Sequence, residues 1–326
     1  QHMISKMRPE NGGARLGIVF NGSPLFAGGA GSGESEIRKW IIEKDMLEAI
    51  IAMPDQLFYN TGISTYTWIV TNRKEKERKG KVQLINAVEF FNKMTRSLGN
   101  KRNEISDEHI AKITKIYGEF KAGGYGKILP NEYFGYTRVT VERPLRLNFQ
   151  ASKERIGRLK QETGFLNLAK SKKKGKDGLK EIEEGEKLQK QILGMLASMD
   201  ASKIYKNRAK FVEAVEKKIE YLALQIKSPV MNAVLNALSE RDETANICLD
   251  KDGKPEPDSE LRDCENVPLA EDIGAYFKRE VLPHVPDAWL DRSKDKVGYE
   301  INFTKEFYKY KPLRSLDEIR KDILAF

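Results

Sequence analysis

Two short polar stretches hold the residue types that could bind a substrate. One is Asn21–Phe26, with the sequence NGSPLF, and the other is Phe58–Thr65, with the sequence FYNTGIST. Aromatic rings offer flat faces on which a nucleobase can stack, hydroxyl groups can orient it, and glycine lets a ligand approach the backbone. The second stretch contains all three kinds of residue: Phe58, Tyr59, Thr61, Gly62, Ser64 and Thr65. These residues predict one rim of a nucleobase pocket.

The same stretch fits a plain hairpin connection with aromatic packing equally well. The rest of the sequence does not decide between the two, because it shows no nucleophile–base pattern. Three histidines, His2, His109 and His284, are scattered along the chain, which leaves no Ser-His-Asp or Cys-His arrangement. The residues by themselves therefore indicate a substrate-facing surface without naming a reaction.

The segments around these stretches predict an α/β fold. Arg15–Phe20 and Leu47–Met53 are short apolar runs suited to buried strands, and apolar residues recur at helical spacing between them, from Ile37 to Ile41. Thr65–Thr71 is typical of a third strand. A strand, a crossover helix and a strand favour a mainly parallel sheet. Because ligands bind such sheets at the carboxyl ends of strands, both polar stretches are well placed.

The composition of the chain limits which binding partners and which cellular compartment we expect. The 326 residues carry 57 Lys and Arg against 48 Asp and Glu, and this net charge of +9 admits a polyanion such as nucleic acid without requiring one. Cys248 and Cys264 stand too far apart for a CxxC pair, and we expect a reduced, cytoplasmic protein. With so few His and Cys residues we expect no metal site. No apolar run approaches the length of a membrane span.

Two groups of basic residues are candidates for contact with a DNA backbone. One lies in Tyr133–Phe149, whose alternation predicts a strand or hairpin, and the other lies in the loop Lys170–Lys176. The candidates are Arg138, Arg143 and Arg146 in the first group and Lys172, Lys173 and Lys174 in the second. Solvent-facing arginines on an edge strand and a solvated linker are the competing interpretations.

Further patterns predict the remaining elements. Val82–Asn86 is typical of a strand, and Glu104–Phe120 is typical of a helix capped by Ser106. Apolar stripes predict helices over 188–199 and, as one long helix, over 211–226, and a further helix begins at Ser228-Pro229. Near the end we expect a short helix at 270–279, a strand at 298–303 and a last helix with a capping box formed by Ser315 and Glu318.

These patterns divide the chain into three regions. Residues 1–150 form a partial α/β domain, residues 151–245 form a helical, charged region, and residues 246–326 form a mixed region with a docking helix. Two stretches within these regions resemble known ligand-binding motifs but lack an essential part of the motif. Ala27–Gly33 (AGGAGSG) lacks the Gly-Lys-Ser/Thr ending of a P-loop and is better interpreted as a mobile surface loop. The acidic stretch within Asn246–Val267 lacks the ligand order of an EF-hand.

Five longer segments resemble consecutive signatures of one protein family. They are GGARLGIVFNGSPLF, EIRKWIIEKDMLEAIIAMPDQLFYNTGIST, GKVQLINA, YFGYTRVTVERPLRLNF and VGYEINFTKEFYKYKPLRSLDEI. In this order they resemble the modification (M) subunit of type I restriction–modification enzymes, an adenine-specific DNA methyltransferase. The resemblance runs from near residue 1 to near residue 326 and is weakest over Ala151–Glu243. It implies the C-terminal part of a Rossmann-like methyltransferase sheet, followed by a mainly helical, charged domain.

The resemblance implies transfer of a methyl group from S-adenosylmethionine to the exocyclic amino group of an adenine that is flipped out of the duplex. Asn21–Phe26 would face the target adenine, and Phe58 with Thr61–Thr65 would form the other wall of its pocket. The pocket candidates are therefore Asn21, Phe26, Phe58, Thr61, Gly62 and Thr65.

The resemblance also implies partners. They are DNA, a specificity (S) subunit that reads the target sequence, a second M subunit and, where present, a restriction (R) subunit. The final helix, Ser315–Phe326, would dock on the S subunit or on the second M subunit. The competing hypothesis is a non-catalytic scaffold that binds partner subunits or DNA.

One departure from the family pattern limits what this chain can do. The cofactor motif Asp-Pro-x-x-Gly-x-Gly and the catalytic motif Asn-Pro-Pro-Phe/Tyr belong upstream of the segment that matches Arg15–Phe20, and neither occurs in this sequence. We therefore expect no catalytic residue here. The resemblance implies that S-adenosylmethionine is bound mainly by an N-terminal part and that this chain alone is inactive.

Overall fold

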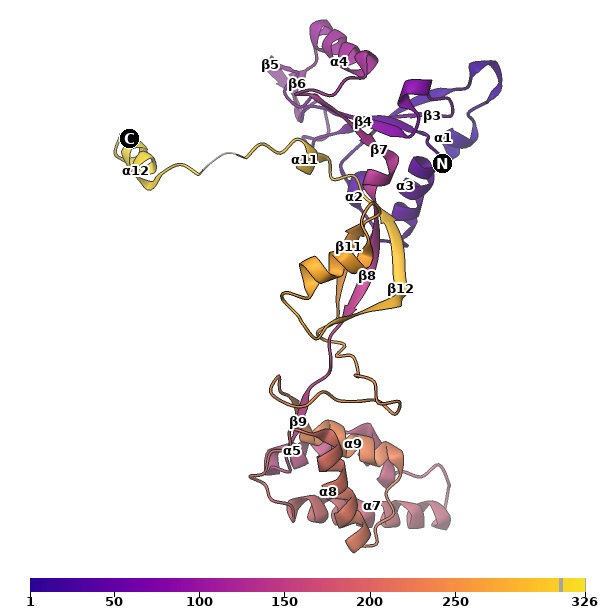
Figure 1. Ribbon diagram of the computed structural model, residues 1–326, viewed down its shortest axis with the longest axis vertical. Coiled ribbons are helices and arrows are strands. Elements are labelled where there is room, and N and C mark those ends of the chain that lie inside the picture. The colour runs from indigo at the N-terminus through magenta and orange to yellow at the C-terminus, as the bar shows by residue number, and fades with distance from the viewer. Residues whose placement is uncertain (311–312, 326) are drawn as a thin grey trace. The chain divides into compact units, whose positions relative to one another are not determined.

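The computed structural model describes residues 1–310 and 313–325, whose contacts form two compact units. The first unit comprises residues 1–140, 264–283 and the described residues from 291 onward. The second comprises residues 141–263 and 284–290. The sequence patterns divide the chain at residues 150 and 245 instead. The two units differ from that division because residues 264–283 and the described residues from 291 onward belong to the first unit. Figure 1 shows the elements of both units.

A five-stranded sheet forms the centre of the first unit. Its strands are β1 (Arg15–Phe20), β2 (Leu47–Ala52), β3 (Tyr66–Thr71), β4 (Lys81–Asn86) and β7 (Gly126–Pro130), in the order β1-β3-β2-β4-β7. The α/β class is confirmed, but the expectation of a mainly parallel sheet is wrong. Only β2 and β4 pair in parallel, since β3 inserts antiparallel between β1 and β2, and β7 pairs antiparallel with β4. An apolar run of this length fits a strand in either direction.

Helix α3 (Gly33–Glu43) covers one face of this sheet (Figure 1). Ser32 caps the helix by accepting a hydrogen bond from the backbone N–H of Ser35. Ile41 and Ile42 of α3 are buried in one cluster with Trp68 and Val70 of β3. Tyr299, Ile301 and Phe303, from the far end of the chain, complete this cluster. The short helices α1 (His2–Ser5) and α2 (Ser23–Phe26) flank β1 in the sequence.

Helix α4 (Asp107–Glu119) covers part of the other face. Ser106 caps it as expected, and Ile113 packs in a buried cluster with Ile85 and Phe90. The helix begins later than predicted, because Glu104 ends strand β6 (Lys101–Glu104). Strand β6 pairs with β5 (Asn92–Leu98) in a hairpin that the sequence analysis did not predict.

Three strands form a second sheet in the order β11-β8-β12. They are β11 (Asp263–Pro268), β8 (Gly135–Glu142) and β12 (Trp289–Tyr299). The strand expected at 298–303 is wrong in its bounds, because β12 ends at Tyr299. The remaining helices of the first unit are α10 (Ile273–Tyr276), which continues as a π-helical turn over Phe277–Val281, α11 (Phe303–Glu306) and α12 (Leu316–Leu324). The capping box of Ser315 and Glu318 is confirmed at α12, and Phe326 lies outside the described residues.

The second unit is mainly helical, as predicted. Its helices are α5 (Lys153–Arg158), α6 (Thr163–Leu166), α7 (Lys176–Ala197), α8 (Arg208–Tyr221) and α9 (Ser228–Leu238), with the short strands β9 (Leu147–Phe149) and β10 (Ser239–Arg241). In its core the ring of Phe149 stacks on that of Phe211 at 5.0 Å between centroids. The single long helix expected over 211–226 is wrong, because α8 ends at Tyr221 and Ala223 adopts a left-handed backbone with φ +51°.

Membrane-spanning helices and metal-binding clusters are both absent from the described part of the chain. Among residues 1–310 and 313–325, no helix has the length and apolar character needed to cross a membrane. The same residues hold no group of three or more His, Cys, Asp or Glu side chains arranged to bind a metal ion.

Candidate functional site

The carboxyl ends of β1 and β2 and the start of β3 lie side by side at one edge of the five-stranded sheet. Phe20, the last residue of β1, pairs with Tyr66, the first residue of β3, and Tyr66 also pairs with Ala52, the last residue of β2. Asn21–Phe26 leaves the sheet directly after Phe20, and Phe58–Thr65 returns to it directly before Tyr66. Both polar stretches therefore meet the sheet at the same edge.

The first stretch, Asn21–Phe26, forms a tight turn and one turn of helix. Oδ1 of Asn21 accepts a hydrogen bond from the backbone N–H of Ser23 (3.1 Å), at the start of α2. Asn21 lines a groove beside β1, whereas the side chain of Phe26 is 58% exposed and does not line that groove. Asn21 can thus meet a ligand in the groove, and the ring of Phe26 faces solvent.

The second stretch, Phe58–Thr65, is a small closed loop. The backbone N–H of Gln56 donates to the carbonyl of Gly62 (3.3 Å) and closes the loop. Between these two residues, Phe58 and Thr61 pair as a single antiparallel β-bridge. The hydroxyl of Thr61 is engaged, since it accepts from the backbone N–H of Ile63 (3.3 Å). Two neighbouring rings point outward: Phe58 is 39% exposed and Tyr59 is 63% exposed. The loop presents aromatic surface, as a stacking site requires.

Two residues of this loop differ from their expected roles. Thr65 is buried, and its hydroxyl oxygen has no hydrogen-bond partner among the described residues. A buried hydroxyl without a partner is costly, which is typical of a site that another group completes. The backbone of Gly62 is ordinary, and a Cβ there would lie 3.7 Å from the side chain of Gln56. Alanine would therefore fit at position 62, so the fold does not require glycine.

The groove beside β1 is a mainly apolar cavity with a volume of about 570 Å³. Much of its apolar lining comes from β1, β3 and α3: Leu16, Ile18, Phe20, Trp68, Val70, Ile37 and Ile41. The buried Nε1 of Trp68 has no hydrogen-bond partner within the part of the chain that the structure describes. Of the six pocket candidates only Asn21 lines this groove. The two expected walls share a sheet edge but not this cavity.

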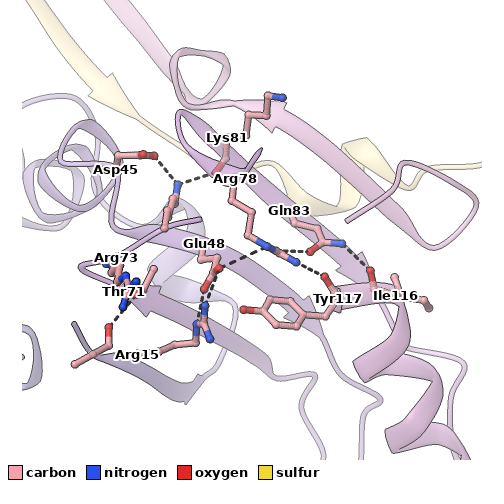
Figure 2. A network of polar contacts seen from close by, with 12 residues as sticks. Arg15, Asp45, Glu48, Thr71, Arg73, Arg78, Lys81, Gln83, Ile116 and Tyr117 are labelled. Carbon is pink, nitrogen blue, oxygen red and sulfur yellow. Dashed lines mark hydrogen bonds and ion pairs between the residues drawn. The ribbon is translucent and has the colours of Figure 1, made fainter. Parts of the chain in front are cut away.

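A network of charged side chains around the buried Glu48 lies at the end of the sheet opposite to the two polar stretches (Figure 2). The carboxylate of Glu48 on β2 is inaccessible to solvent and accepts hydrogen bonds from Arg15 at 2.7 and 3.2 Å. Arg78 lies 3.6 Å from the same carboxylate and donates to Gln83 Oε1 (3.1 Å) and to the carbonyl of Tyr117. Burial next to Glu48 raises the pKa of Tyr117 to about 12. The network ties α4 to β2 and β4, which is a structural role.

A second polar cluster lies around Asp45, which precedes β2. Its carboxylate accepts hydrogen bonds from Lys74 (2.5 Å), from Asn131 (2.8 Å) and from the backbone N–H of Gly80 (3.0 Å). Burial opposes ionisation of Asp45, but these donors outweigh it and lower the pKa of the carboxyl below its ordinary value. Lys74 also donates to the carbonyl of Lys81 (2.7 Å). This cluster fixes the loop between β3 and β4.

The three arginine candidates are divided between the two units. Arg138 is exposed on β8 in the first unit, whereas Arg143 and Arg146 belong to the second. Arg146 is already engaged, with Asp287 at 2.9 Å and with the carbonyl of Ala245 at 3.0 Å. The Nε of Arg143 is buried without a hydrogen-bond partner among the residues described. Arg138 and Arg143 therefore remain better candidates for a phosphate than Arg146.

The lysine candidates lie in the loop before α7. Lys172 and Lys174 are exposed. Lys173 forms an ion pair with Glu181 at 2.5 Å, and this hydrogen bond raises the pKa of Lys173. A contact with phosphate by Lys173 would have to compete with that carboxylate.

Sequence reasoning missed the basic β5–β6 hairpin, which adjoins the second stretch. The backbone N–H of Asn100 donates to the carbonyl of Tyr59 (2.9 Å), and those of Arg102 and Asn103 donate to the carbonyl of Gln56 (3.0 and 3.2 Å). The dipeptide Gly99-Asn100 between two short polar strands is a two-residue hairpin signal that could have revealed it.

Comparison with known proteins identifies a protein family and individual proteins that are similar to part of this chain. Residues 1–135 match the family model described as N-6 DNA Methylase. The MjaVIII methylase subunit of a type I restriction enzyme from Methanocaldococcus jannaschii is 39% identical over 119 residues, which cover 36% of this chain and 20% of that protein. The MjaIX methylase subunit from the same organism is 31% identical over 201 residues, which cover 61% of this chain and 34% of that protein.

A solved structure belongs to the same group. It is the methyltransferase subunit of a type I restriction–modification system from Streptococcus thermophilus, with 26% identity and a TM-score of 0.35 over 41% of this chain and 26% of that chain. This chain thus spans between a fifth and a third of the length of the curated relatives named above. The first 135 residues of this chain are thus similar to the N-6 DNA methylases, and part of the chain is similar to the methylase subunits of type I restriction enzymes.

Proposed function

We propose that this chain supplies part of an adenine-specific DNA methyltransferase, the modification subunit of a type I restriction–modification system. The whole enzyme transfers a methyl group from S-adenosylmethionine to the exocyclic amino group of adenine, in the cytoplasm. The observation that carries the proposal is the match of residues 1–135 to the N-6 DNA Methylase family. The shared sheet edge of Asn21–Phe26 and Phe58–Thr65 supports it further.

The target base would lie at this sheet edge. The exposed rings of Phe58 and Tyr59 would stack on the flipped adenine, as aromatic side chains do in base-flipping enzymes. The hydroxyl of Thr65 is buried and lacks a partner among the described residues, so a hydrogen bond to the base or its sugar would satisfy it. Asn21 and Phe26 would approach the base from the end of β1. These roles position the base and leave the chemical step to other residues.

The cofactor does not fit the residues of this chain. The groove beside β1 is lined mainly by apolar side chains, and the Asp-Pro-x-x-Gly-x-Gly motif is absent from the sequence. S-adenosylmethionine would therefore be held mainly by a part of the enzyme that precedes β1. We accordingly assign no step of methyl transfer to a residue of this chain, and we expect the chain alone to be inactive.

The partners follow from the same proposal. DNA, a specificity subunit, a second modification subunit and a restriction subunit would assemble with the whole protein. Helix α12 offers a docking surface, because its apolar side chains Leu316, Ile323 and Leu324 are 84%, 69% and 76% exposed. Apolar side chains at helical spacing on an exposed helix favour a partner helix or groove.

The exposed apolar side of α12 also favours a second candidate function. In this alternative the chain is a non-catalytic scaffold that binds partner subunits or DNA. The two candidates differ in one measurable property. A scaffold assembles with its partners without methyl transfer, whereas the methyltransferase part restores transfer once its partners are present.

The test is transfer of labelled methyl groups from S-adenosylmethionine to DNA. We expect none with this chain alone, and incorporation at adenine once the chain is joined to the upstream region of its gene and assembled with the S subunit. A complex that assembles but never methylates would instead favour the scaffold. In the active complex, Phe58→Ala should lower methylation more than ten-fold at unchanged assembly. Tyr221→Ala, which removes an exposed ring from α8 in the second unit, is the control.

A further inference from the structure

The β5–β6 hairpin concentrates positive charge. Between Asn92 and Glu104 it carries four cationic side chains, Lys93, Arg96, Lys101 and Arg102, against the single carboxylate of Glu104. None of the four forms an ion pair with a carboxylate of the described residues. Lys93, Arg96 and Arg102 are exposed. Arginines elsewhere, such as Arg241 and Arg262, are paired with carboxylates. Unpaired charge gathered on one element is the electrostatic footprint of a polyanion site.

The hairpin is fixed to the loop that bears the exposed rings. The carbonyl of Gln56 accepts hydrogen bonds from the backbone N–H groups of Arg102 and Asn103. The side chain of Asn103 is buried and donates to the carboxylate of Asp55 (3.0 Å). Because these bonds join β6 to the residues just before Phe58, the position of the hairpin and that of the aromatic loop are coupled.

The tip of the hairpin touches the same loop. Gly99 has a left-handed backbone with φ +61°, and a Cβ at this position would lie 2.6 Å from the carbonyl oxygen of Tyr59. The ammonium of Lys101 lies 5.4 Å from the centroid of the Tyr59 ring, within cation–π range. Cation, ring and backbone therefore form one continuous surface from the hairpin to Phe58–Thr65.

We propose that the β5–β6 hairpin binds the phosphate backbone of duplex DNA beside the position where the target base leaves the stack. The inference rests on the proposed function for the choice of duplex DNA. Duplex DNA supplies the matching charge, with about one negative charge per 1.7 Å of helix axis, and its major groove admits a two-stranded ribbon. Lys93, Arg96, Lys101 and Arg102 contact phosphates, and Tyr59 lies between them and the flipped base.

Binding of this chain to a short fluorescent DNA duplex, measured by anisotropy over a range of salt concentrations, tests the proposal. The hairpin variant replaces Lys93, Arg96, Lys101 and Arg102 with glutamine. We expect its affinity at low salt to fall by at least about ten-fold and the slope of log K against log salt to decrease by about 3. The control replaces Lys44, Lys76, Lys79 and Lys81, at the opposite edge of the sheet, and should lose about two-fold or less. Equal losses in the two variants would overturn the proposal.

A second variant tests the position of the hairpin without changing its charge. Gly99→Ala places a methyl group against the carbonyl of Tyr59 and strains a left-handed backbone, so it should displace the tip and weaken DNA binding several-fold. Gly80→Ala imposes a similar strain at φ +70° with open space around the added Cβ, and its DNA binding should match the wild type. Circular dichroism confirms folding of both. Wild-type DNA affinity in a folded Gly99→Ala protein would contradict a fixed hairpin.

The outcomes separate this inference from the proposed function. A hairpin variant that loses DNA binding supports the inference even if the assembled complex never methylates adenine, which would overturn only the proposed function. A complex whose methylation and DNA affinity survive the hairpin substitutions would overturn only the inference. Equal affinity of the hairpin for a polyglutamate peptide would assign it to an acidic protein and overturn its assignment to DNA.

Discussion

The guanidinium Nε of Arg38 donates a 2.6 Å hydrogen bond to the backbone carbonyl of Tyr299, which lies 261 residues further along the chain. The other nitrogens of Arg38 bind carbonyls of Pro24, Ala27 and Gly28. One buried side chain thus joins α3, the glycine-rich stretch and the end of β12. The glycine-rich stretch is anchored at its start by these bonds, and a phosphate cradle would need its backbone N–H groups instead.

Replacing Arg38 should destabilise the first unit strongly. Arg38→Met keeps the bulk of the side chain but removes the donor of four backbone carbonyls, one of them fully buried, and we expect a loss of about 3 kcal/mol. Urea unfolding followed by tryptophan fluorescence measures it, because Trp40 and Trp68 report on this unit. Glu36→Gln, an exposed change on the same helix, is the control. A loss below about 1 kcal/mol for Arg38→Met would contradict the anchoring role.

The two ends of the Glu48 network should respond unequally. Glu48→Leu leaves the buried guanidinium of Arg78 without a carboxylate, and we expect a cost of about 3–5 kcal/mol. Arg15→Leu removes a cation whose side chain is 47% exposed, so water can replace part of its interaction and the cost should be about 1 kcal/mol. Chemical denaturation of both variants provides the comparison. Equal losses of stability in the two variants would show that the buried Arg78–Glu48 pair contributes nothing beyond the partly exposed Arg15–Glu48 pair.

Asp45 should make stability depend on pH in the acidic range. The pKa of Asp45 is lower in the folded protein than its ordinary value of 3.8, so the ionised carboxylate stabilises the fold. This contribution is fully present above the unfolded pKa and is lost as the pH falls through the folded pKa. The melting temperature of Asp45→Asn should therefore lie below that of the wild type above about pH 5, and the difference should shrink towards more acidic pH. A difference independent of pH would contradict this assignment, and the exposed Asp252→Asn provides the baseline.

Two glycines of α7 should give opposite effects when changed to alanine. A Cβ at Gly194 meets nothing within 4 Å, so Gly194→Ala should stabilise the second unit by about 0.5–1 kcal/mol through helix propensity. A Cβ at Gly185 would lie 1.8 Å from the carbonyl oxygen of Leu168, so Gly185→Ala should destabilise it by about 2 kcal/mol despite the same gain in propensity. Thermal unfolding by circular dichroism measures both. Stabilisation by Gly185→Ala would show that α7 does not pack closely on this segment.

Local signals in the sequence predicted individual elements well. The apolar run of β1 gave its bounds as Arg15–Phe20, and Ser315 with Glu318 marked the start of α12, because these signals act over a few residues. The direction of β3 was missed, since its pattern is the same in a parallel and an antiparallel sheet. The β5–β6 hairpin was missed because its residues are polar and mostly exposed, and they carry no buried stripe.

The candidate site was predictable in part. The order of strands and loops was enough to bring Asn21–Phe26 and Phe58–Thr65 to one edge of a sheet. Tertiary contacts decide the rest. The bond of Arg146 to Asp287, 141 residues away, and the separation of Arg138 from Arg143 into different units depend on how distant segments meet. Neither the Arg146–Asp287 bond nor the division of Arg138 and Arg143 between two units can be predicted from the spacing of residues along the chain.

The interleaving of the two units sets an order of events during synthesis. The core of the first unit needs Tyr299, Ile301 and Phe303, whereas the second unit is nearly all encoded between Val141 and Asp263. At translation rates of about 5–20 residues per second, the sheet waits roughly 10–30 s for its last core residues after Thr140 is made. The helical unit can fold on the ribosome during that delay. The apolar core residues of the first unit stay exposed on the nascent chain during the same delay.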